Sequence, residues 1–432
     1  SVSIRYNKIT RINRSTYDTP SAGTELVDGC DKYLIPGLWD MHSHRSWNYF
    51  GTYIANGVIG VRDMGNPVLS LVEIEELRQK IHNGHIIGPR IVTAGHQIIN
   101  KSTNDRRVEA TTPKRGRQVV DSLKAAGADF IKVYNLSRQT FFAIADQAEK
   151  RGIPIAGHLS PEVTLTEASK AGQKNIEHYT VFKPFGLIPL CSSRPEQHRH
   201  LLEKLKGIGV PPTDSVHIAQ RHKIAKLTVE SYDEDRCRRE TKRLAEYDTW
   251  HTPTLIADMM HPRIHNDRIF QNPIFKYGSP TSQKRYEWIR SLMVANFSES
   301  LLLDYQSTIG RIITNLQRGG VGILAGTDNG GFYGFGLHQE LGLLVEAGLS
   351  PLESLQAATL NAAKYLGRSD DLGAVEVGKL ADLVLLDANP LEDISNTQKI
   401  RAVVANGRYL NRSELDRILK EVEVLTRGKS EE

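Results

Sequence analysis

The feature that most constrains the fold of this chain is a repeated alternation of short apolar segments with helical segments. Eight apolar segments have the length of a strand, and helical spacing or a Gly or Pro break separates most of them. They are residues 36–44, 58–63, 90–94, 130–134, 155–158, 175–178, 250–255 and 320–328. Alternation of this kind indicates a parallel sheet with right-handed crossovers. Eight units predict an α/β fold, a (β/α)8 barrel of the TIM type.

The two ends of the chain differ from this middle part. Residues 1–35 are short apolar pieces joined by turns, and strand character returns in the tail at 378–387 and 400–404. We therefore expect one small β-sandwich domain built from residues 1–35 and 372–432, with the barrel occupying 36–371.

Residues 186–249 interrupt the barrel pattern with Leu, Arg, Lys, Glu and His at helical spacing, which predicts a helical insertion and a candidate lid. The histidines of this insertion allow two interpretations, a second metal cluster or solvated helix faces. Their spacings converge on no single point, which favours the second. These histidines are His198, His200, His217 and His222.

Composition excludes several classes of function. The net charge of +5 is small for 432 residues, and no basic stripe alternates with aromatic residues, so nucleic-acid binding is not expected. No run of about 18 apolar residues predicts a membrane span. Three widely spaced cysteines do not indicate a disulfide framework. No signal peptide is visible, and two compartments stay open: the cytoplasm, or export with a leader removed upstream of Ser1.

Residue types that bind metals stand at the ends of the predicted strands. His42 and His44 are two positions apart, so both side chains point to one side of their strand. Such a pair also occurs on surface turns, but His158, His178 and Asp328 end later strands in the same way. The carboxyl ends of barrel strands meet at one rim. The sequence therefore predicts a metal centre at that rim.

Lys132 is the strand residue that most needs an explanation. Residue parity places it on the face opposite to its apolar neighbours Ile131 and Val133, toward the barrel interior. A buried unpaired ammonium is costly, and a protonated lysine has no lone pair for a metal. Two interpretations stay open: an ion pair with Asp328 or Glu177, or a carbamate formed with CO2 that bridges two cations. The nearby histidines favour the carbamate.

The chain resembles the amidohydrolase superfamily, in its imidazolonepropionase-like and prolidase-like branch. The order HxH, Lys, His, His and Asp is highly specific for it, and the similar pieces span nearly the whole chain. These pieces are PGLWDMHSH (36–44), GVRDMG (60–65), GADFIKVY (127–134), RGIPIAGH (151–158), NIEHY (175–179), LAGTDNGG (324–331), LQAATLNAAKYLG (355–367) and GKLADLVLLDANP (378–390).

The resemblance implies a binuclear metal centre with six protein ligands. One ion is held by His42, His44 and Asp328, and the other by His158 and His178. Carboxylated Lys132 and a hydroxide bridge the two ions, which are best matched by Zn2+, with manganese, cobalt and iron as alternatives. The implied reaction is hydrolysis of a C–N bond in a small molecule, with the hydroxide as nucleophile and Asp328 as general base and acid.

The substrate is less well defined than the reaction. Dipeptidases of this branch have a Gly-Gly-His stretch after the third strand and a tyrosine shortly after the strand-five histidine. Here the corresponding residues are Gly95-His96-Gln97 and Leu159-Ser160-Pro161. His96, Tyr134 and Tyr179 are candidate substrate contacts by position, and structural hydrogen bonding is an equal alternative for each.

Three other functions remain to be weighed. A mononuclear deaminase would lack the bridging lysine and would place its acid three residues after the strand-five histidine, whereas Glu162 lies four after His158. A non-catalytic scaffold would be expected to lose ligands, and all six are kept. An esterase, lactonase or phosphotriester hydrolase could use the same centre. A homo-oligomer is compatible with the sequence.

Overall fold

The computed structural model describes residues 1–13, 23–44, 47–65, 69–101, 107–178, 187–204, 215–257, 262–266, 273–277, 280–328 and 332–428. In the part of the chain so described, no helix has the length and apolar character that crossing a membrane requires.

Within the described ranges, eight strands form the barrel, as the sequence predicts. They lie in two parallel sheets, β4-β5-β6 and β13-β12-β11-β10-β9, and β7 and β8 extend the second sheet. Backbone hydrogen bonds join the sheets on both sides, from Met41 N to Ala325 O (2.9 Å) and from Asp129 N to Thr93 O (2.9 Å). The strands are β4 (Leu38–Ser43), β5 (Val58–Asp63), β6 (Arg90–Thr93), β9 (Ile131–Tyr134), β10 (Ile155–Gly157), β11 (Gln173–Glu177), β12 (Trp250–Thr252) and β13 (Gly322–Ile323), with β7 (Gln97–Ile99) and β8 (Arg107–Glu109).

Helices cover the outside of the barrel, and several begin at side-chain caps. Ser70, Thr164 and Ser350 each form a capping box with a glutamate three residues later. Such caps bind the first backbone N–H groups, which have no partner inside the helix. The barrel helices are α1 (Phe50–Ala55), α2 (Leu71–His82), α3 (Pro113–Ala125), α4 (Arg138–Lys150), α5 (Leu165–Lys170), α10 (Pro280–Asn296), α11 (Glu299–Arg318), α12 (Phe335–Glu346), α13 (Pro351–Ala357) and α14 (Leu360–Tyr365).

The barrel strands separate apolar residues from polar ones. On β9, Ile131 and Val133 belong to the main apolar core, whereas Lys132 is a fully buried polar residue on the other face. On β11, Ile176 is in the apolar core, and its neighbours Asn175 and Glu177 are buried and polar. Because side chains alternate along a strand, the helix-facing side is apolar and the barrel interior holds the charges.

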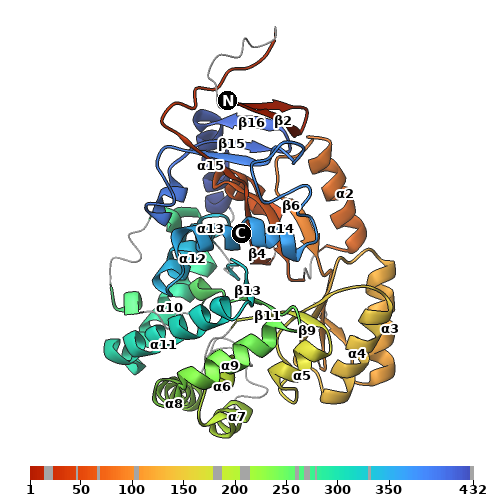
Figure 1. Ribbon diagram of the computed structural model, residues 1–432, viewed down its shortest axis with the longest axis vertical. Helices are drawn as coiled ribbons and strands as arrows, with labels where there is room; N and C mark the ends of the chain where they lie inside the picture. The colour runs from red at the N-terminus through yellow and green to blue at the C-terminus, as the bar shows by residue number, and fades with distance from the viewer. Residues whose placement is uncertain are drawn as a thin grey trace.

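Both termini contribute to a separate antiparallel sheet, in the order β16-β15-β14-β3. Its strands are β3 (Tyr33–Pro36), β14 (Leu383–Leu386), β15 (Ile400–Ala405) and β16 (Arg408–Asn411). The hairpin of β1 (Val2–Arg5) and β2 (Lys8–Ile12) lies beside it and joins the tail through the bridge between Lys8 and Leu380. The predicted two-terminus β-sandwich is thus present (Figure 1). The exact domain boundaries stay a prediction.

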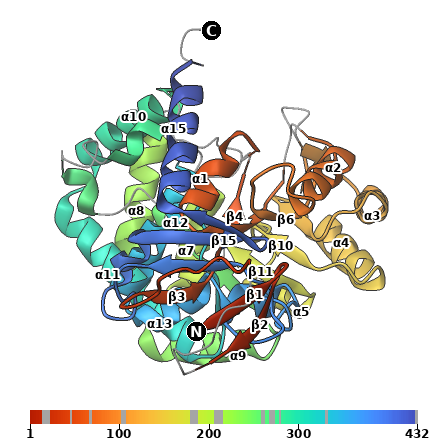
Figure 2. The same cartoon turned by 90° about the horizontal axis from the view of Figure 1, so that it is seen from above.

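The tail contains a helix that was not predicted, α15 (Arg412–Gly428). It lies along α1, as Figure 2 shows from above. Leu415, Ile418 and Val422 are its buried apolar residues. A Cβ at Gly51 of α1 would lie 2.6 Å from Cγ2 of Ile418, so glycine permits this close approach.

In the region of the expected insertion, the described residues form helices α6 (Leu187–Leu190), α7 (Pro195–Glu203), α8 (Ser215–Ser231) and α9 (Glu234–Ala245). Two features differ from expectation. Cys191 and Cys237 form a disulfide, with Cα atoms 4.2 Å apart, so a single bridge is present without a framework. His198 is buried and contacts Ser231 Oγ at 3.1 Å, so it is no solvated helix residue.

Candidate metal centre

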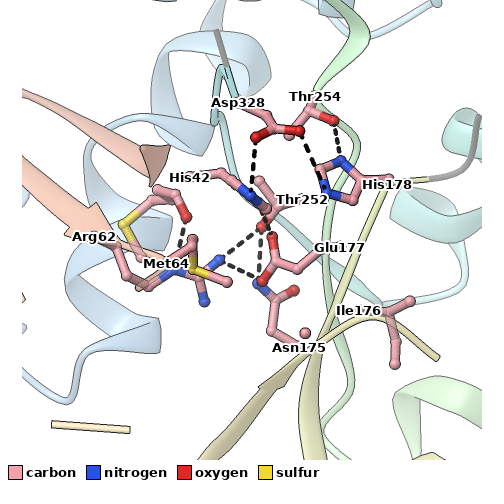
Figure 3. Close-up of polar contacts among 12 residues, drawn as sticks. His42, Arg62, Met64, Asn175, Ile176, Glu177, His178, Thr252, Thr254 and Asp328 are labelled. Carbon is pink, nitrogen blue, oxygen red and sulfur yellow. Dashed lines mark hydrogen bonds and ion pairs between the residues drawn. The ribbon is translucent and has the colours of Figure 1, made fainter. Parts of the chain in front are cut away.

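Three of the predicted ligand histidines, His42, His44 and His178, converge on the carboxylate of Asp328. Figure 3 shows two of them, His42 and His178, facing this carboxylate. Oδ1 of Asp328 lies 3.6 Å from Nε2 of His42 and 3.4 Å from Nε2 of His44. Oδ2 lies 3.7 Å from Nε2 of His178. Ligand atoms of His42, His44 and Asp328 all lie within 4.8 Å of one another, so this group could hold a metal ion.

The other ring nitrogen of each histidine faces an acceptor. Nδ1 of His42 lies 2.6 Å from Glu177 Oε2, and Nδ1 of His44 lies 3.3 Å from the carbonyl oxygen of Gly65. Nδ1 of His178 lies 2.6 Å from Thr254 Oγ1. An Nδ1–H that donates to these oxygens leaves a lone pair on Nε2. Three lone pairs aimed at one carboxylate repel it, and cations between them remove that repulsion, so the donor set fits metal ions.

The backbone is strained where it delivers these residues. The φ angles of His178, Thr254 and Asp328 are 64°, 51° and 44°, in the left-handed region that non-glycine residues rarely adopt. Such conformations cost about 1–3 kcal/mol each and persist where the surroundings enforce them. Backbone N–H groups of Thr327 and Asp328 donate to the carbonyl of His42, which fixes the end of β13 against β4. Three residues with such strain therefore lie at the candidate centre, while others, such as Tyr6 and Asn406, lie elsewhere.

The buried carboxylate of Asp40 also fixes Thr327, the residue before Asp328. It accepts hydrogen bonds from Thr327 N at 3.0 Å and Thr327 Oγ1 at 2.7 Å. Burial raises the pKa of Asp40 to about 6, although these bonds and one from His42 N act in the opposite direction.

His158 and Lys132 lie on the neighbouring strands. His158 directly follows β10, and its ring lies 4.9 Å from the ring of His178. Gly157 precedes it with φ +138°, and a Cβ there would lie 2.3 Å from Val133 O, so only glycine fits. Lys132 is fully buried on β9 and pairs in register with Ala156. Its inward face is the one that also carries Tyr134, whose ring lies 4.1 Å from that of His158.

The sequence did not predict the roles of two buried residues, Arg62, which was not named, and Glu177, which was named only as a possible ion-pair partner of Lys132. Arg62 is fully buried, and its Nη2 donates to Glu177 Oε1 at 2.7 Å. Asn175 Nδ2 donates to the same oxygen at 2.8 Å. Glu177 therefore connects His42 to a buried cation. The sequence signal was a charged residue inside each of two apolar strand segments, the same signal that singled out Lys132.

The three residues predicted as substrate contacts differ in their distance from the candidate centre or lie outside the described residues. Tyr134 lies at the centre, beside His158, and the guanidinium of Arg107 lies 4.5 Å from its ring centroid. His96 is half-buried in the turn between β6 and β7. Tyr179 lies outside the described residues.

Glu162, the nearest carboxylate to a deaminase position, is committed elsewhere. It accepts a hydrogen bond from the backbone N–H of Arg138 at 3.0 Å, and its carbonyl accepts from the Arg138 guanidinium. This places it at the N-terminus of α4, an arrangement that explains it as a helix-capping residue.

Comparisons with known proteins agree with this architecture. An amidohydrolase family model matches residues 33–410. Ochratoxinase of Aspergillus niger is 38% identical over 438 aligned residues, covering 86% of this chain and 73% of the relative. An imidazolonepropionase of Geobacillus sp. is 41% identical over 80 residues, covering 18% of this chain and 19% of that protein.

Solved structures share the fold at low sequence identity. The bottromycin amidohydrolase AH has a TM-score of 0.71 and 21% identity, covering 98% of this chain and 85% of that one. A Xaa-Pro dipeptidase with methionine in its active site has a TM-score of 0.60 and 21% identity, covering 95% and 94%. The family match and the ochratoxinase relative confirm the expected superfamily branch. The chain therefore belongs to the amidohydrolase family and is a hydrolase that acts on carbon–nitrogen bonds.

Proposed function

We propose that this protein is a binuclear metal-dependent hydrolase that cleaves an amide or peptide-like bond in a small molecule. The observation that carries the proposal is the convergence of three histidine Nε2 atoms on Asp328, each with its Nδ1 facing an acceptor. His42, His44 and Asp328 would hold one divalent cation, and His158 and His178 the other. Lys132, carboxylated by CO2, would supply oxygen ligands to both, and Zn2+ is the expected metal.

Two bound cations would supply an activated water and polarise the scissile carbonyl. Asp328 would take the proton of that water and deliver it to the leaving amine. Its carboxylate lies at the mouth of the barrel, with 11% of the side chain exposed, so both water and the leaving group can reach it. The ring of Tyr134, next to His158, would line the space for the substrate.

Arg107 suggests the charge of the substrate. Its guanidinium stacks on Tyr134, and it forms no ion pair within the described part of the chain. An anionic group on the substrate could bind there, with Tyr134 between it and the metal ligands. We therefore favour N-acyl amino acids and dipeptides, which carry a free carboxylate, over their neutral amides. The relatives named ochratoxinase and Xaa-Pro dipeptidase make these two groups the first to test.

The test combines metal analysis with a substrate screen. Protein purified without chelator, after growth with zinc, should contain about two ions per chain by elemental analysis. The metal-replete protein is then assayed with N-acyl amino acids, dipeptides, their C-terminal amides, and lactones. Faster hydrolysis of the acids than of their amides is expected. One ion or none would contradict the binuclear centre, and turnover of lactones alone would favour the esterase alternative.

A further inference from the structure

We propose that the two sides of the metal centre have unequal affinities because their histidines are supported by acceptors of different charge. The carboxylate of Glu177 supports His42, whereas the neutral hydroxyl of Thr254 supports His178. Both are positioning residues, and the ion on the His42 side binds more tightly and therefore first. The inference rests on the proposed function for its ligand set.

The contact between Glu177 and His42 is short and fully buried. Oε2 lies 2.6 Å from Nδ1, and neither side chain is exposed to solvent. A carboxylate that accepts the Nδ1 proton increases the electron density on Nε2, the atom that faces Asp328. Because both side chains are buried, bulk solvent screens this effect little. His42 is therefore a stronger metal ligand than a histidine with a neutral partner.

Arg62 holds the Glu177 carboxylate in place. It donates to Oε1, which leaves Oε2 for His42. Its own orientation is fixed by a hydrogen bond from Nε to Met41 O at 2.6 Å. The guanidinium also lies 4.9 Å from the ring centroid of Tyr365. Burying such a pair costs desolvation energy, so it adds little stability by itself. Its benefit is a fixed, charged acceptor behind one metal ligand.

Thr254 holds His178 equally firmly, but without charge. Its Oγ1 donates to the carbonyl of Pro253 at 2.7 Å, so a lone pair faces Nδ1 of His178. The strained turn is itself held by Glu340 of α12. This carboxylate accepts the backbone N–H groups of Leu255 and Ile256 at 3.0 and 2.8 Å. His178 is thus oriented by a neutral hydroxyl, and its Nε2 gains less electron density.

The test is a stepwise Zn2+ titration of metal-free protein against a competing chromophoric chelator, with bicarbonate present to allow carboxylation of Lys132. Wild type should show two dissociation constants. Glu177→Gln should lower the affinity of the first, tighter Zn2+ binding step by about 10- to 100-fold, the usual effect of removing the partner of a metal-bound histidine. The affinity of the second step should change little. Thr254→Val should lower the affinity of the second, weaker Zn2+ binding step. Thr254→Ser keeps the hydroxyl and should bind Zn2+ in this step as wild type does.

The matched control is Asp382→Asn. Asp382 is also a buried carboxylate paired with an arginine, Arg90 Nε at 2.6 Å, but it lies in the terminal region. Its replacement should leave both constants unchanged. If Glu177→Gln alone fails to fold, Glu177→Gln with Arg62→Met removes both charges and takes its place in the titration.

Unchanged constants in the Glu177 variant, or equal weakening of both steps, would overturn the inference. So would Glu177 and Thr254 variants that weaken the same step. A wild type that binds a single ion would contradict the proposed binuclear function instead, and the effect of Glu177→Gln on that one ion would still test the support of His42.

Discussion

Lys132 lies fully buried on the inward face of β9, two residues before the ring of Tyr134 that contacts His158. In the proposed centre it carries a carbamate that lowers the repulsion between two cations. Lys132→Ala should therefore lower both bound metal and turnover steeply, and millimolar acetate should restore part of each. Lys132→Arg should not help, because a guanidinium stays charged and cannot form the carbamate under these conditions.

An ion-paired Lys132 gives a different result. Its replacement by Ala would mainly lower the free energy of unfolding, by about 3–5 kcal/mol for a buried pair, and acetate would have no effect. Elemental analysis and turnover of wild type, Ala and Arg variants, with and without acetate, separate the two. Retention of two ions and most activity in the Ala variant would reject the carbamate.

The sequence predicted that the candidate ligands lie close together, but it did not predict the residues that contact them from behind. The proximity of His42, His158, His178 and Asp328 was predictable because residues at the ends of parallel barrel strands meet at one rim. The contact of Glu177 with Arg62 joins residues 115 positions apart. Which buried charges pair depends on side-chain direction inside the barrel, which strand parity alone does not determine.

The buried Glu340 of α12 makes the free energy of unfolding depend on pH. Burial raises the pKa of Glu340 from 4.5 to about 8, against the two N–H bonds it accepts. The folded protein then keeps a proton that the unfolded chain releases, so its free energy of unfolding falls as pH rises from 4.5 through 8. In Glu340→Gln, the free energy of unfolding should decrease less between pH 5 and pH 9 than in wild type, by roughly a few kcal/mol. Denaturant melts of both proteins across this range measure the difference, and parallel curves would contradict it.

A disulfide joins α9 to the residue that directly follows α6. Cys191 and Cys237 are 46 residues apart. By loop entropy, such a bridge stabilises the fold by about 4 kcal/mol. Replacing both by Ser, or adding a reductant, should lower the melting temperature of this region. The exposed Cys30 provides the control, because Cys30→Ser should change nothing. Equal melting of oxidised and reduced protein would exclude a stabilising bridge.

The strands of the barrel were predictable from the sequence, whereas the contacts between helices were not. The eight strands follow from apolar segments and Gly or Pro breaks. The bridge was not expected, since only the packing of α6 against α9 brings its sulfurs together. Helix α15 was not predicted because the tail segments before it have strand character, although Leu415, Ile418 and Val422 follow helical spacing.

The whole molecule depends on its two ends, because β3 from the N-terminal part pairs antiparallel with β14 from the tail. Val384 of β14 also packs where β5 begins, since a Cβ at Gly57 would lie 2.7 Å from its Cγ2. Deleting residues 378–432 should leave β3 without its partner and expose apolar surface on the barrel. An unpaired strand edge promotes aggregation.

A shorter deletion separates the two contributions of the tail. Removing residues 412–432 takes away α15 alone and leaves the terminal sheet intact. Its three buried side chains, Leu415, Ile418 and Val422, contribute about 1.5–3 kcal/mol each when fully buried. We expect this protein to remain soluble but to melt at a lower temperature, while the longer deletion aggregates. Size-exclusion chromatography and thermal melts compare the two. A soluble, cooperatively melting protein without residues 378–432 would show that the barrel folds independently of the terminal sheet.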